Sequence, residues 1–224
     1  MNQALETIEI ATGDAPGASI IWLHGLGADG NDFVPIVEEL DLPRGVDIRF
    51  VFPHAPMIPV TANGGYVMRA WYDINLDGPE RRPDAVGLRA SGAAIEQLLA
   101  RERERGIAAE RIVLAGFSQG GAVTLQTGLR HSERLAGLMV LSSYLPLPET
   151  VAAEAAPANA PVPIFFAHGQ YDPVIPIQRA ERSRVHLEQL GYAVEWHSYP
   201  MQHSLCAQQI VDIGRWLQKV LPAS

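Results

Sequence analysis

The chain has 224 residues, of which 47% are hydrophobic and 19% charged, and its formal net charge is −8 at pH 7. A chain of this length can bury a core without disulfides, which agrees with its single cysteine, Cys206, and the negative charge disfavours broad nucleic-acid binding. The first residues lack a basic region followed by an apolar core, and no later run approaches the length of a membrane span, so we expect a cytoplasmic protein without stable membrane insertion.

Short apolar runs alternate with stretches of helical periodicity along the chain. They predict strands near residues 5–10, 18–23, 47–52, 111–116, 137–142, 163–168 and 193–199. Helices are predicted near residues 32–41, 84–105, 119–130, 178–190 and 204–220. This alternation is typical of an α/β fold with a mostly parallel central sheet and helices on both faces, and we expect one domain over residues 1–224.

Two stretches, residues 53–83 and 143–163, interrupt this alternation and read as irregular. The second is rich in alanine and proline and is too short for a separate lid domain. Within the long helix predicted at 84–105, arginine and glutamate alternate over residues 101–105, a pattern typical of a solvated helix face.

A glycine-rich loop, Gly25 to Gly30, follows the second predicted strand and fits the dinucleotide pattern GxGxxG. A dinucleotide site needs a free helix terminus and an acidic residue at the end of the next strand. Here Asp29 and Asp32 crowd the loop, and the next strand ends in Phe52-Pro53-His54 without a carboxylate. We prefer the interpretation that the loop approaches a reacting group and that the N–H of Leu26 donates to an oxyanion. A dinucleotide enzyme is the competing hypothesis.

The segment Gly116-Phe117-Ser118-Gln119-Gly120-Gly121 lies between the strand predicted at 111–116 and a helix. Glycines two residues before and two residues after Ser118 give room for the tight turn of a nucleophile elbow, which pushes the serine oxygen outward. At the start of the helix the N–H of Gln119 is a natural donor to an oxyanion. The alternative is an idle capping serine, which would need no glycine on both sides.

A serine nucleophile in this sheet order needs an acid and then a histidine, each on a loop after a later strand. Asp172 follows the strand predicted at 163–168, and His203 follows that at 193–199. We therefore predict that His203 is the general base for Ser118 and that Asp172 fixes the tautomer of its imidazole. Asp172 as a plain turn residue and His203 as a solvated loop residue are the ordinary alternatives, and the required chain order favours catalysis.

Four further polar residues near these positions receive structural interpretations. His24 and His168 stand at predicted strand ends, where they are expected to orient loops. Ser204 is expected to cap the last helix, and Cys206, one turn into that helix, is expected to be a packed thiol and not a nucleophile.

Several motifs together carry a family resemblance. They are residues 23–32, Pro53-His54-Ala55-Pro56, Trp71-Tyr72-Asp73, Gly116 to Gly121, His168 to Val174 and His203-Ser204. With these the chain resembles the bacterial carboxylesterase and acyl-protein thioesterase family, also called the phospholipase/carboxylesterase family. The resemblance implies an α/β-hydrolase without a lid domain, with Ser118, Asp172 and His203 as the catalytic triad and the backbone of Leu26 and Gln119 as the oxyanion hole.

The resemblance also implies a substrate class. Members of the family cleave short- to medium-chain acyl esters, some of them also lysophospholipids or S-acyl thioesters, without metal or organic cofactor. Tyr66, Trp71, Tyr72 and Val174 would line the acyl pocket, although Trp71 and Tyr72 could equally anchor a long loop that Asp73 ties down.

We therefore expect a serine carboxylesterase acting on a small-molecule ester or thioester, with no cofactor or metal. Acyl-protein thioesterase as the main activity and a non-catalytic ligand-binding α/β-hydrolase are the alternatives. A homodimer stays open.

Overall fold

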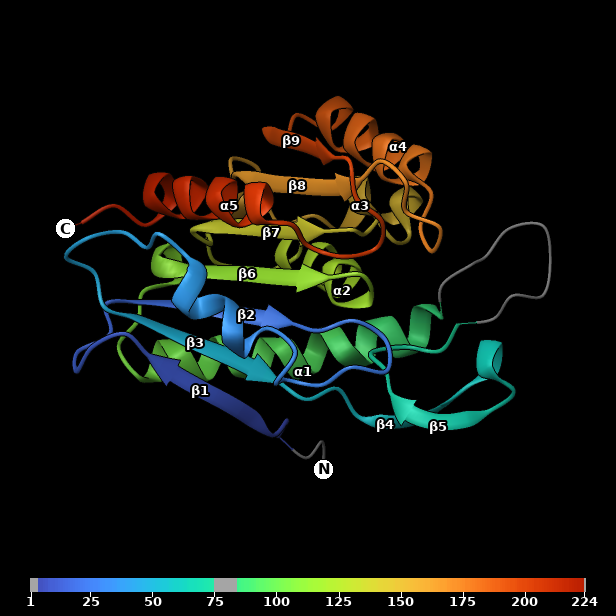
Figure 1. Ribbon diagram of the computed structural model, residues 1–224, viewed down its shortest axis with the longest axis horizontal. Helices are drawn as coiled ribbons and strands as arrows, with labels where there is room; N and C mark the ends of the chain where they lie inside the picture. Colours follow the sequence, from blue (N-terminus) through green and yellow to red (C-terminus); the bar gives the residue numbers. More distant parts are fainter. Residues whose placement is uncertain (1–3, 75–83, 224) are drawn as a thin grey trace.

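The computed structural model describes residues 4–74 and 84–223. Its centre is a seven-stranded sheet of order β1-β3-β2-β6-β7-β8-β9 (Figure 1). The strands are β1 (Thr7–Ala11), β2 (Ala18–Leu23), β3 (Ile48–Pro53), β6 (Ile112–Phe117), β7 (Gly137–Leu141), β8 (Ile164–Gly169) and β9 (Val194–Tyr199). All neighbours pair in parallel except β1 with β3, so six strands end at the same edge of the sheet.

Helices cover both faces of this sheet. The α-helices are α1 (Ala85–Glu104), α2 (Gln119–Gly128), α3 (Pro148–Glu154), α4 (Ile177–Gln189) and α5 (Ala207–Val220). The 3₁₀ helices are η1 (Val34–Glu39), η2 (Thr61–Asn63), η3 (Ala109–Arg111) and η4 (Pro157–Asn159). The predicted α/β-hydrolase architecture, a mostly parallel sheet between helices, is confirmed.

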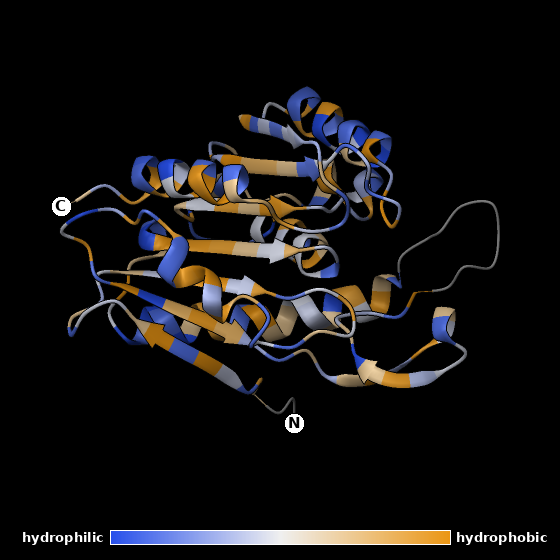
Figure 2. Cartoon of the chain, in the orientation of Figure 1, coloured by the Kyte–Doolittle hydropathy of each residue, from blue (hydrophilic) through white to orange (hydrophobic). Residues whose placement is uncertain are grey.

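The central strands are buried on both faces, so successive side chains enter two separate cores. In β2, Ile21 and Leu23 join a core with residues of α1, α2 and α4, whereas Ile20 and Trp22 join a second core with residues of η1 and α5. Figure 2 shows α5 with hydrophobic and hydrophilic residues in alternation, as expected for a helix with one face on the sheet and one in water.

Three predicted elements differ from the structure. Residues 32–41 form only the short 3₁₀ helix η1, which contains Pro35 and stops where Leu40 turns extended. The stretch 53–83, predicted as irregular, holds the hairpin of β4 (Met57–Val60) and β5 (Tyr66–Arg69), and the stretch 143–163 holds α3. These elements are too short and too interrupted by proline and glycine for their periodicity to stand out.

The last helix also begins later than predicted. Cys206 lies at the N-cap position with extended backbone, and the first helical residue is Ala207. Ser204 therefore does not cap this helix, and Cys206 does not lie one turn inside it. The segment before α5 instead makes tight turns, with the N–H of Ser204 donating to the carbonyl of Gln202 at 3.0 Å.

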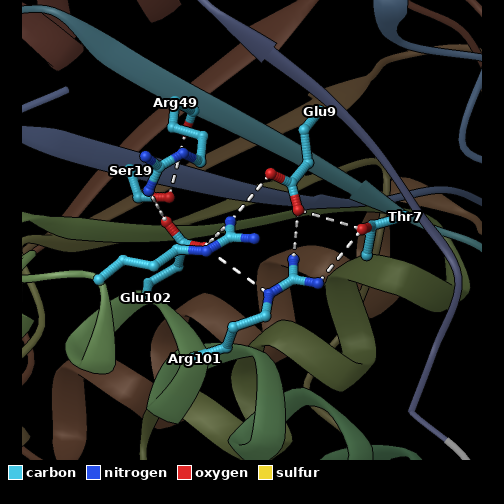
Figure 3. A network of polar contacts seen from close by, with 7 residues as sticks. Thr7, Glu9, Ser19, Arg49, Arg101 and Glu102 are labelled. Carbon is cyan, nitrogen blue, oxygen red and sulfur yellow. Dashed lines mark hydrogen bonds and ion pairs between the residues drawn. The ribbon is translucent and has the colours of Figure 1, made fainter. Parts of the chain in front are cut away.

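An ion-pair network joins α1 to the first strands of the sheet (Figure 3). The fully buried carboxylate of Glu102 accepts from Arg49 of β3 at 3.0 Å, and Arg101 pairs with Glu9 of β1 at 2.9 Å. The expectation of a solvated face for the arginine–glutamate segment is therefore wrong at Glu102. This end of α1 lies against charged residues of β1 and β3, so the carboxylate lies between the helix and the sheet.

Within the described part of the chain, none of the helices combines the length and apolar character that crossing a bilayer requires.

Candidate active site

Ser118 occupies a tight turn between β6 and α2. Its backbone has φ 55° and ψ −118°, a conformation rare for residues other than glycine. A Cβ on Gly116 would overlap the carbonyl group of Gly120, and a Cβ on Gly120 would overlap the carbonyl oxygen of Leu23. The N–H of Ser118 donates to the carbonyl of Leu141 in β7 at 2.9 Å. The turn therefore has the geometry of a nucleophile elbow, and the flanking glycines give the space it requires.

Ser118, His203 and Asp172 form one hydrogen-bonded line. The Oγ of Ser118 lies 3.0 Å from Nε2 of His203, and Nδ1 of His203 lies 2.7 Å from Oδ2 of Asp172. Since the Asp172 carboxylate accepts, Nδ1 carries the proton and Nε2 is free to accept the serine proton. Three residues 31 and 85 positions apart in sequence meet here because β6, β8 and β9 end at the same edge of the sheet.

Backbone N–H groups fix the Asp172 carboxylate. Its Oδ1 accepts from the N–H of Val174 at 2.8 Å and from the N–H of Ile175 at 2.9 Å, and the side chain is fully buried. His168 lies beside it, with Nε2 donating to the carbonyl of Ile175 at 2.8 Å. Burial lowers the pKa of His168, so its imidazole stays neutral, and it orients this loop as expected.

Two backbone N–H groups beside Ser118 lack an acceptor. Within residues 4–74 and 84–223, neither the N–H of Leu26 nor that of Gln119 makes a hydrogen bond, and both residues line the same cavity as Ser118. Gln119 is the first residue of α2, where the helix dipole adds positive potential. The structure thus brings together the two donors predicted from the sequence with the serine they would serve.

His24 fixes the loop that carries Leu26. Its Nδ1 donates to the carbonyl of Gly25 at 2.7 Å, and its Nε2 accepts from the N–H of Ala55 at 3.0 Å. Burial lowers the pKa of His24 to about 4, so the neutral ring needed for this pair of bonds persists at neutral pH. His24 therefore orients a loop, as the sequence suggested.

The side chain of Gln119 has a role that the sequence did not reveal. Its Oε1 accepts from the N–H of Trp71 at 3.0 Å, and its Nε2 donates to the carbonyl of Tyr72 at 2.8 Å. Both bonds are buried, and they join the elbow to the long segment that follows β5. The sequence interpretation considered only the backbone of Gln119, because nothing in the chain pattern shows where an amide side chain will find partners.

A cavity of about 420 Å³ opens beside Ser118 and His203. Of the four residues expected in the acyl pocket, Tyr72 and Val174 line this cavity. Trp71 and Tyr66 are not among its lining residues, and Trp71 instead fits the alternative of a loop anchor.

Trp71 is buried, with its indole N–H donating to the carbonyl of His24 at 2.8 Å. It anchors the loop and does not form the pocket wall. Tyr66 is 70% exposed on the β4–β5 hairpin. Asp73 ties the long segment down as expected, because it accepts from the N–H and the hydroxyl of Thr61.

Several cavity residues escaped the sequence interpretation, among them Tyr144, Arg179 and Ile74. Tyr144 lies just beyond β7, Arg179 lies in the first turn of α4, and Ile74 follows the anchored segment. Its position after a parallel strand could have identified Tyr144 as a cavity residue, since ligand sites of α/β sheets lie at the carboxyl ends of the strands. For Arg179 the sequence offered no signal, because a helical pattern does not say which cavity a flanking side chain faces.

The loop from Gly25 to Gly30 does not lead into an α-helix. Only η1 follows it, beginning at Val34, and the N–H of Gly30 already donates to Nδ1 of His54 at 3.1 Å. The loop thus lacks the free helix terminus that binds a pyrophosphate. Among the described residues, no group of three or more His, Cys, Asp or Glu side chains is placed to hold a metal ion.

A family model described as Phospholipase/Carboxylesterase matches residues 5–221. The chain belongs to this family. Among curated relatives, "Acyl-protein thioesterase 1" of Neurospora crassa is 41% identical over 215 residues, covering 92% of this chain and 87% of the relative. The protein of the same name from Gibberella zeae is 38% identical over 214 residues, covering 92% and 91%. The expected restriction to bacterial members is wrong, because these relatives are eukaryotic.

Solved structures of plant proteins agree with this membership of the phospholipase/carboxylesterase family. Acyl-protein thioesterase 2 of Zea mays superposes with a TM-score of 0.85 at 28% identity, covering 96% of this chain and 99% of the other. SOBER1 of Arabidopsis thaliana gives a TM-score of 0.83 at 27% identity, covering 91% and 99%. As a family member, the chain is a hydrolase of carboxylic ester or thioester bonds.

Proposed function

We propose that this hydrolase cleaves short- to medium-chain acyl esters and thioesters through an acyl-enzyme on Ser118. The observation that carries the proposal is the hydrogen-bonded line from Ser118 through His203 to Asp172, beside two backbone N–H groups that have no acceptor among the described residues. In this arrangement a nucleophile, a base and an oxyanion site face one cavity.

In the first half-reaction, the Oγ of Ser118 attacks the substrate carbonyl while Nε2 of His203 takes its proton. The Asp172 carboxylate stabilises the resulting imidazolium through Nδ1–H. The N–H groups of Leu26 and Gln119 bind the oxyanion, and each such donor typically lowers the barrier by about 3 kcal/mol. His203 then protonates the leaving alcohol or thiol, and the acyl group remains on Ser118.

In the second half-reaction, water replaces the leaving group. His203 removes a proton from the water, the oxygen attacks the acyl carbonyl, and the same two N–H groups hold the second oxyanion. When this intermediate breaks down, the proton returns to Ser118 and the carboxylic acid leaves. The sum is one ester or thioester and one water converted to one acid and one alcohol or thiol.

Acyl-protein thioesterase activity is the second candidate, because the curated relatives in Neurospora crassa and Gibberella zeae carry that name. The chemistry at Ser118 is the same for both bonds. We further propose that residues 1–224 act as one domain in the cytoplasm.

The test compares wild type with Ser118→Ala and His203→Ala on a short-chain aryl ester and its thioester analogue. We expect both variants to lose activity at least a thousandfold on both substrates, and only the wild type, in which His203 activates Ser118, to react rapidly with a fluorophosphonate. Wild-type rates in Ser118→Ala would refute the assignment. A wild-type protein that neither turns over nor labels would instead indicate the non-catalytic ligand-binding alternative. The ratio of thioester to ester kcat/KM decides between the two activities.

A further inference from the structure

Arg179 places a positive charge in the wall of the cavity that holds Ser118. It lies in the first turn of α4, is half-buried, and its guanidinium carbon lies 3.5 Å from the centre of the Tyr144 ring. Stacking on an aromatic face holds a guanidinium in place but uses none of its five N–H donors. Arg179 is thus oriented with its hydrogen-bonding capacity still available.

In the described part of the chain, no acceptor takes up these donors. Across residues 4–74 and 84–223, the guanidinium of Arg179 makes no ion pair and donates no hydrogen bond, whereas Arg89 and Arg130 both pair with Glu154. Nor does its charge favour the helix, because a cation in the first turn faces the positive end of the dipole. The position of Arg179 is therefore not explained by stabilisation of α4.

The same part of the cavity offers a second donor. The hydroxyls of Tyr72 and Tyr144 lie 2.9 Å apart, so one donates to the other and the second O–H keeps its hydrogen free. Burial raises the pKa of Tyr72 well above its ordinary value, which keeps the phenol protonated. Ile74 and Ile175, which also line the cavity, are apolar.

Among the described residues, Asp32 is the other charged residue of the wall besides the catalytic set, and it lies beyond the loop that carries Leu26. It is exposed and makes no ion pair with Arg179 in the described structure. The Asp172 carboxylate is already bound by His203 and two backbone N–H groups. Among the residues that the structure describes, the subsite at Arg179 therefore has donors and positive charge without an acceptor.

We propose that Arg179 binds an anionic group of the substrate, so that the preferred ester or thioester carries a carboxylate or similar oxyanion away from the bond that is cleaved. This inference rests on the proposed hydrolysis at Ser118 and adds a substrate class to it. The free tyrosine hydroxyl supplies one further hydrogen bond to the same anion. A planar guanidinium can bind a carboxylate through two parallel N–H bonds.

The experiment uses two pairs of esters, and within each pair one ester carries a carboxylate that the other lacks. In the first pair the acyl group is charged or neutral: 4-nitrophenyl hemiglutarate and 4-nitrophenyl valerate. In the second pair the alcohol is charged or neutral: 4-butyryloxybenzoate and phenyl butyrate. Wild type, Arg179→Gln and Arg182→Gln are compared. Arg182 is the matched control, because it is exposed on the same helix and does not line the cavity.

We expect Arg179→Gln to lower kcat/KM for one anionic ester about tenfold or more, as loss of a charge-assisted hydrogen bond does, with the neutral partner within twofold. The Arg182→Gln control should match wild type on all four. An effect on hemiglutarate places the anion on the acyl group, and an effect on butyryloxybenzoate places it on the alcohol. Either result supports the inference.

The inference of an anion subsite would be overturned if Arg179→Gln changed kcat/KM equally for charged and neutral esters, or changed it in neither pair. A direct readout separates this inference from the proposed catalysis: glutarate binding to wild type and Arg179→Gln is measured by calorimetry. If no ester is turned over, the proposed function fails, while weaker glutarate binding in Arg179→Gln would still support the anion subsite. Equal glutarate binding in the two proteins would refute it.

Discussion

Replacing Gln119 by alanine removes two buried hydrogen bonds that join the elbow to the cavity wall, while keeping the backbone N–H beside Ser118. In the native protein the side chain accepts from Trp71 N–H and donates to Tyr72 C=O, both in buried surroundings. The substitution leaves these two backbone groups without partners. A buried orphan group costs about 1–3 kcal/mol, so we expect the free energy of unfolding to fall by about 2–6 kcal/mol.

Catalysis should suffer as well, because Tyr72 lines the cavity and its backbone would lose its anchor. We expect kcat/KM on a short aryl ester to fall about tenfold or more, a loss typical of misplaced groups near a reacting centre. Urea unfolding and steady-state kinetics measure the two effects. Gln119→Met keeps the length of the side chain without its hydrogen bonds, so it separates the effect of packing from that of hydrogen bonding. Gln208→Ala, at an exposed position of α5, is the control. Wild-type stability and kinetics in both Gln119→Ala and Gln119→Met would show that these two hydrogen bonds do not hold the cavity wall in place.

Three further outcomes follow from the contacts. In Gly169→Ala, the added Cβ would overlap the carbonyl oxygen of Gln202, so the loop that carries His203 must shift. We expect the free energy of unfolding, measured in urea, to fall by about 1–3 kcal/mol and kcat to fall as well. Unchanged kinetics would contradict this. Because burial lowers the pKa of His24 to about 4, the unfolded chain takes up the proton first as pH falls, and stability should drop by about 2 kcal/mol between pH 8 and pH 5. His24→Asn should lack this part of the pH dependence, and an identical slope in urea unfolding would show that His24 is not its source. Glu102→Gln weakens a buried ion pair far from the cavity. Thermal unfolding should therefore show a free energy of unfolding lower by about 1–3 kcal/mol, while kcat/KM stays within twofold. A large kinetic effect would contradict the purely structural role of Glu102.

The sheet could be predicted from the sequence because its strands are fully apolar runs between helices of clear periodicity. β2 and β8 are buried along their whole length, and the predicted bounds lie within one residue of the observed ones. The β4–β5 hairpin could not be found in the same way. Its strands have four residues each, one contains Pro59, and only Val60 is buried, so no hydrophobic alternation marks them.

At the candidate site, the order of residues along the chain was sufficient to predict which residues after the strands lie close together. Ser118, Asp172 and His203 each follow a strand of one parallel sheet, and such ends must lie near one another. The pocket wall depends instead on side-chain direction in loops and helix ends. Trp71 and Tyr72 are adjacent in sequence, yet one turns into the core and the other into the cavity. Only the folded chain separates these two roles.

The most direct test of the central claim is to trap the acyl-enzyme. The protein is mixed with a slowly hydrolysed activated ester, quenched in acid within the first turnovers, digested and analysed by mass spectrometry. We predict that the mass of one acyl group appears on the peptide containing Ser118, and that it is absent in Ser118→Ala. An acyl adduct on another residue, or turnover without any adduct on Ser118, would contradict the account.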